Sequence, residues 1–154
     1  MRLDYMKACP EGFSAMVGLE EAVRRSTIEP ELLELVRTRV SQINGCAFCL
    51  GMHNRDARAA GEHQVRLDTL PAWRETPYFS DRERAALAWA ESLTTVATTR
   101  APQALYDDLT AVFAPEEIAA LTFAIVAING WNRLAIGLES DVTTLEGLDA
   151  PPAA

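Results

Sequence analysis

The chain has 154 residues, with 14 basic and 22 acidic side chains and a formal net charge of −8. This length fits one domain with a single core, and an apolar content of 49% excludes a disordered polymer. An acidic chain without a basic stripe is a poor candidate for binding nucleic acid or an anionic membrane surface.

The composition favours helices, because 25 alanines stand against 8 glycines and 8 prolines. Apolar residues recur at helical spacing, and prolines, capping residues and glycines mark the ends of the segments. No segment shows the alternation typical of a strand. We therefore expect an all-α protein, a compact bundle of six or seven helices. The predicted helices cover residues 10–26, 30–44, 46–60, 80–93, 102–113 and 115–138, and the arm at 63–79 has room for one short helix.

The whole chain is expected to form one domain over residues 1–154, with a mobile tail at 150–154. The most apolar stretch, Ile118 to Asn132, has 15 residues without a charge, which is too short to cross a bilayer comfortably. The N-terminus lacks the apolar segment of a signal peptide. These features predict a cytoplasmic protein without a membrane partner.

The most informative segment contains Cys46-Ala47-Phe48-Cys49 followed by His53. At about 100° per residue, Cys46, Cys49 and His53 fall within about 60° of arc on one helix face. The free N–H groups of a helix start favour a thiolate, which is the reactive form of cysteine. The spacing therefore predicts a redox dithiol with an adjacent base.

Glu34 lies 12 residues before Cys46 and joins this site only if the chain turns back. Asn44-Gly45 supplies that turn. If the two helices run antiparallel, Glu34 stands about 15 Å along the first and His53 about 12 Å along the second. We expect the carboxylate to orient the imidazole, which gives a nucleophile, a base and an orienting acid. The redox core is thus expected over residues 30–61.

The motif Glu34-(11 residues)-Cys46-x-x-Cys49-(3 residues)-His53 resembles the signature of the AhpD-like alkylhydroperoxidases, within the wider carboxymuconolactone decarboxylase family. The later segment 129–134, with Trp131, Asn132 and Arg133, is similar to one branch of that family. We expect these three residues at a pocket or a subunit interface. One departure is Phe48, which stands where the founding alkylhydroperoxidase has a histidine.

The resemblance implies an AhpD-like helical fold, a trimer or hexamer, and a thiol-dependent peroxidase that reduces hydroperoxides with electrons from an external dithiol. It implies that Cys49 is the peroxidatic cysteine and Cys46 the resolving one, with His53 and Glu34 as the proton relay. The expected mechanism needs neither a metal nor an organic cofactor.

Three alternatives stay open at this point. A zinc site could use Cys46, Cys49 and His53 with either Glu34 or His63. A redox sensor would need the same accessible, low-pKa thiol as a peroxidase. The wider family also includes a lactone decarboxylase, although members of that branch do not depend on a cysteine pair.

Overall fold

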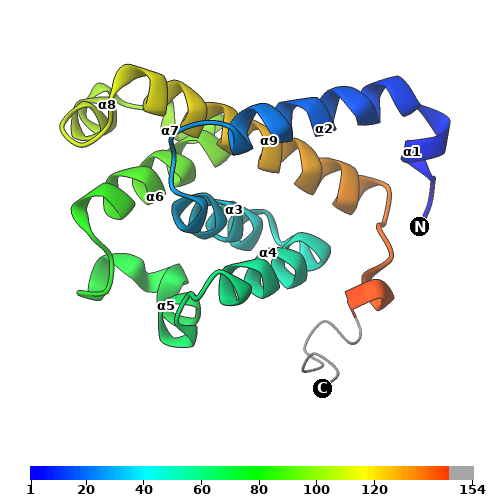
Figure 1. Ribbon diagram of the computed structural model, residues 1–154, viewed down its shortest axis with the longest axis horizontal. Coiled ribbons are helices and arrows are strands. Elements are labelled where there is room, and N and C mark those ends of the chain that lie inside the picture. Colours follow the sequence, from blue (N-terminus) through cyan, green and yellow to red (C-terminus); the bar gives the residue numbers. More distant parts are fainter. Residues whose placement is uncertain (146–154) are drawn as a thin grey trace.

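The computed structural model describes residues 1–145, and in this part of the chain helices joined by loops are the only regular elements, with no strand (Figure 1). The expected tail at 150–154 lies outside the described residues. Within residues 1–145, seven α-helices have six residues or more, as predicted, and two others are single turns of four residues. The elements are α1 (Tyr5–Ala8), α2 (Pro10–Arg24), α3 (Pro30–Asn44), α4 (Ala47–Ala59), α5 (Gln64–Thr69), the 3₁₀ helix η1 (Leu70–Glu75), α6 (Asp81–Thr94), α7 (Val96–Thr99), α8 (Gln103–Thr110), α9 (Pro115–Gly137) and the 3₁₀ helix η2 (Val142–Leu145).

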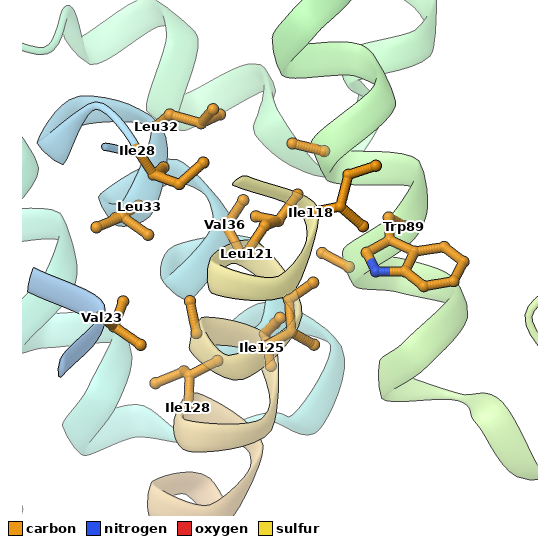
Figure 2. Packing of buried hydrophobic residues seen from close by; sticks show 14 of the residues in the cluster. Val23, Ile28, Leu32, Leu33, Val36, Trp89, Ile118, Leu121, Ile125 and Ile128 are labelled. Carbon is orange, nitrogen blue, oxygen red and sulfur yellow. The ribbon is translucent and has the colours of Figure 1, made fainter. Parts of the chain in front are cut away.

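The longest helix, α9, forms the centre of the core. Pro115 occupies its first position, where no backbone N–H is needed, and the Glu117 carboxylate accepts a hydrogen bond from the Ala114 N–H (2.8 Å). The uncharged stretch that follows packs against α2, α3 and α6. Figure 2 shows Leu121 and Ile125 of this helix among apolar side chains of α3 and α6.

Within the described residues, α9 is also the one helix long and apolar enough to cross a membrane. Eight of its residues are buried against the other helices. It therefore serves as the central core helix of this bundle.

Helix α3 lies between two apolar clusters. Leu33, Val36 and Val40 face the main cluster with α9, whereas Leu35 faces a second cluster built from the arm and α6. This burial on two sides explains why eight of its fifteen residues are buried. The position of α3 is therefore fixed by packing, and its polar side chains are held with it.

A tight turn returns the chain from α3 to α4. Gly45 caps α3 in the left-handed conformation (φ 69°), which glycine adopts without a steric penalty. The N–H groups of Gly45 and Cys46 bond back to carbonyls of the last turn of α3. Helix α4 then runs beside α3 (Figure 1).

Candidate active site

The two cysteines lie at the start of α4. Cys46 is the N-cap residue rather than part of the first turn, and its sulfur accepts a hydrogen bond from the Cys49 backbone N–H (3.3 Å). The two Sγ atoms are 2.6 Å apart, and the exposed fractions of the residues are 1% and 2%. Closing a disulfide needs a movement of only about half an ångström. The pair is therefore arranged as a dithiol that can be oxidised in place.

The hydrogen bonds favour a negative charge on Cys46 over one on Cys49. The Cys49 thiol and backbone N–H groups donate to the Cys46 sulfur, and together they outweigh burial and lower the pKa of Cys46 to about 7. The pKa of Cys49 is raised because its thiol proton is held by Cys46, because it is buried, and because the Cys46 charge opposes its own. One proton is thus shared between the two sulfurs near neutral pH.

Asn132 of α9 closes the site from the opposite side. Its side chain is fully buried beside the pair and acts to lower the pKa of both thiols, because it favours their charged forms. The Asn44 amide donates to Asn132 Oδ1 (2.8 Å), and Asn132 Nδ2 donates to Ser41 Oγ (3.2 Å). Asn132, which was expected at a pocket or an interface, therefore borders the two sulfurs.

The other two residues of that segment lie apart from the sulfurs. Arg133 is exposed and donates to the carbonyl and side chain of Asn129, and it borders an apolar hollow of about 600 Å³ between α1, α2 and α9. The Trp131 ring meets Phe13 edge to face, and its N–H donates to Glu20 (3.1 Å). Neither side chain hydrogen-bonds to the dithiol within the described residues.

Glu34 and His53 are brought together across the turn. His53 Nδ1 lies 2.8 Å from Glu34 Oε2, and both side chains are largely buried. With Nδ1–H donated to the carboxylate, Nε2 is the nitrogen free to exchange a proton. His53 lies one helical turn beyond Cys49 on α4. The antiparallel arrangement expected from the sequence thus places a carboxylate behind the imidazole.

The Glu34 carboxylate is kept ionised despite its surroundings. Burial raises the pKa of Glu34, but the hydrogen bond with His53 and the charges of His53 and Arg37 outweigh burial and leave the pKa below its usual value. Arg37 Nη1 donates to Glu34 Oε1 (2.7 Å) and Arg37 Nη2 donates to Glu20 Oε2 (2.6 Å). Sequence reasoning missed Arg37, although Glu34-x-x-Arg37 has the spacing of an ion pair on one helix.

A hollow of about 360 Å³ lies beside the dithiol. It is bordered by Cys46, Phe48, Ala135 and Ile136, among other mostly apolar residues, and it touches Cys46 rather than Cys49. Phe48, the departure from the founding alkylhydroperoxidase, therefore contributes an apolar wall here.

One further group in the described part of the chain has the composition of a metal site. Glu34, His53 and Asp56 have ligand atoms within 4.8 Å of one another, but Glu34 is paired with Arg37 and Asp56 with Arg55. Neither cysteine belongs to this group, and His63 is exposed at the start of α5. The residues brought together do not fit the cysteine–histidine zinc site considered above.

Comparison with known proteins places this geometry in a family. The model of the carboxymuconolactone decarboxylase family matches residues 10–92, which include both cysteines, Glu34 and His53. The chain belongs to this family. The uncharacterised protein YdfG of Bacillus subtilis (strain 168) is 39% identical over 137 residues, 89% of this chain and 93% of YdfG.

Two solved structures share the fold. A protein of unknown function from Agrobacterium tumefaciens, named as a candidate AhpD antioxidant defence protein, has 42% sequence identity and a TM-score of 0.87, covering 91% of this chain and 96% of its own. The debrominase Bmp8 has 20% identity and a TM-score of 0.79, and the match covers 94% of this chain and 80% of the Bmp8 chain. The latter likeness shows the fold alone, and the AhpD-like helical fold expected from the sequence is confirmed.

Proposed function

We propose that this member of the carboxymuconolactone decarboxylase family is a thiol-dependent peroxidase that reduces hydroperoxides. The observation that carries the proposal is a buried dithiol at the start of α4, beside a histidine held by a carboxylate. This arrangement supplies the nucleophile, the base and the orienting acid that thiol chemistry needs. The candidate AhpD structure from Agrobacterium tumefaciens supports the same reaction class.

The proposed reaction starts with the Cys49 thiolate and a hydroperoxide. An S–O bond forms as the O–O bond breaks, and the leaving alkoxide takes a proton from His53 and departs as an alcohol, or as water when the substrate is hydrogen peroxide. Cys49 is then a sulfenic acid. The Cys46 sulfur attacks it, so that the S–S bond forms and the S–O bond breaks, and water leaves with the Cys46 proton. An external dithiol reduces the disulfide.

The proposed roles of the two sulfurs make use of their shared proton. The resting charge is favoured on Cys46 by its hydrogen bonds. When the shared proton lies on Cys46, the charge lies on Cys49, one helical turn from His53, where an imidazolium stabilises it. On this ground, and from the family resemblance, we propose Cys49 as peroxidatic and Cys46 as resolving.

Peroxide consumption with a dithiol reductant tests the proposal, in a Cys9→Ser background that removes the exposed third thiol. Cys49→Ser should abolish turnover, because no thiolate remains beside His53. Cys46→Ser should leave a sulfenic acid on Cys49 that a dimedone-type reagent traps. Trapping on Cys46 in the Cys49→Ser protein would reverse the roles, and equal turnover in both variants would reject the dithiol mechanism.

We also propose that the chain is one domain that acts in the cytoplasm as a homo-oligomer, a trimer or a hexamer. Phe123 and Val126 of α9 keep 56% and 55% of their surface exposed. Leu19 and Ala22 of α2 border an apolar hollow next to Phe123. An apolar face of this kind is typical of protein–protein contact.

A further inference from the structure

A chain of hydrogen bonds connects the active-site histidine to a tryptophan on another helix. Trp131 Nε1 donates to Glu20 Oε1 (3.1 Å), and Arg37 donates to Glu20 Oε2 (2.6 Å) and Glu34 Oε1 (2.7 Å). Glu34 Oε2 then meets His53 Nδ1 (2.8 Å). The connection crosses α9, α2, α3 and α4, and both carboxylates use both of their oxygens.

Arg37 is the centre of this connection. Only 8% of its surface is exposed, and it lies between two carboxylates that are themselves mostly buried. A guanidinium presents several donors in one rigid plane, so it can hold two carboxylates in fixed orientations. A carboxylate bonded at only one oxygen can rotate, whereas Glu34 is bonded at both. Its orientation toward His53 therefore depends on Arg37.

We propose that Arg37, anchored by Glu20 and Trp131, is a positioning residue that holds Glu34 in the orientation that fixes the His53 ring. This inference rests on the proposed function, in which His53 moves protons at the dithiol. It goes beyond that function because it assigns a role to Glu20 and Arg37, which touch neither the sulfurs nor the imidazole through any hydrogen bond of the described residues.

Nuclear magnetic resonance of the histidine side chains tests the inference without any peroxide. The chain has two histidines, so His63→Gln assigns the remaining signals to His53. The parent should show a downfield Nδ1–H proton bonded to Glu34. Arg37→Gln should broaden or remove this signal, Arg37→Lys should restore it in part, and Glu20→Gln should weaken it. Because Arg37→Gln removes the guanidinium from two mostly buried carboxylates and can unfold the chain, the near-isosteric Glu20→Gln is the second probe.

Arg39→Gln is the matched control. Arg39 also lies on α3 and forms a mostly buried ion pair, with Glu91 (2.8 Å), but it has no hydrogen bond to Glu34. Its loss should leave the His53 signal and turnover unchanged. Among folded variants, Arg37→Gln should lower kcat/KM for peroxide roughly three- to tenfold and Glu20→Gln roughly two- to threefold. In a Glu34→Gln protein, adding Arg37→Gln should cost less than about twofold, because residues acting as a unit are non-additive.

An unchanged His53 signal in folded Arg37→Gln and Glu20→Gln proteins would overturn the inference, whatever the activity. Equal loss of the signal in Arg39→Gln would also overturn it, since the effect would then be general destabilisation of α3. If the signal responds as expected but the parent consumes no peroxide, the proposed function fails while the role of Arg37 stands. The two failures are therefore distinguishable.

Discussion

The sulfur of Cys46 has two structural roles. It takes the N-cap position that a serine or aspartate oxygen usually fills, and the same sulfur is the partner of Cys49 in the dithiol. The backbone N–H that the cap satisfies also stabilises a negative charge at the helix start. Helix formation and thiol activation therefore depend on the same contact.

This contact predicts a pH dependence of alkylation. Because the pKa of Cys46 is lowered to about 7, below the value of about 8.5 for a free cysteine, the thiolate fraction should rise through pH 7. In a reduced Cys9→Ser protein, the rate of iodoacetamide labelling should show its midpoint there. Labelling that rises only above about pH 8.5 would show that the Cys49 thiol, the helix start and Asn132 do not lower the pKa of Cys46.

The sequence predicted one part of the site and missed another, for physical reasons. The contact of Glu34 with His53 follows from two helix lengths and one turn, so helix geometry alone brings the two residues to matching heights. Glu20 and Trp131 are 111 residues apart, and their contact depends on how α2 packs on α9. The sequence does not reveal that packing, so the spacing of Glu34 and Arg37 predicts only an ordinary surface ion pair.

At the level of elements, the α3–turn–α4 unit determines the site. Its bounds were predicted closely, because Pro30 and Gly45 are strong local signals for helix ends. The single turns α1 and α7 were not predicted, since four residues carry no periodicity. The arm was expected to have one short helix, and it contains α5 and η1, whose Leu67, Leu70 and Trp73 complete the second core cluster.

Replacement of the turn glycine tests this unit. Gly45→Ala should lower the free energy of unfolding by about 1–2 kcal/mol, because an added Cβ disfavours the left-handed conformation. No atom lies within 4 Å of that Cβ, so the cost is one of backbone conformation alone. The matched control is Gly18→Ala in the exposed middle of α2, which should be neutral or stabilising by up to about 1 kcal/mol. Urea denaturation measures both, and equal effects would contradict the argument.

At the level of the whole molecule, one core helix has both a buried and an exposed apolar side. The buried side of α9 joins α3 and α6, as Figure 2 shows, whereas Phe123 and Val126 face outward. Exposed apolar side chains on a core helix cost solubility unless a partner covers them. The self-association that we propose would bury this face.

Light scattering at micromolar concentration should therefore give a mass of three or six chains. The double substitution Phe123→Lys and Val126→Lys should shift the mass toward a single chain, because burying two unpaired charges opposes association. Val65→Lys is the control, since Val65 is comparably exposed but lies on α5. A parent protein with the mass of one chain would contradict the assembly.

The central claim is that Glu34, His53 and the dithiol act as one unit, and a double-mutant cycle on peroxide turnover tests it most directly. Glu34→Gln should lower turnover at least about tenfold in a folded protein, within the range of base catalysis, and His53→Gln should cost at least as much. The double variant should cost far less than the product of the two single losses, because each change disables the same relay. Unchanged turnover in folded Glu34→Gln, or strictly multiplicative losses, would contradict the account.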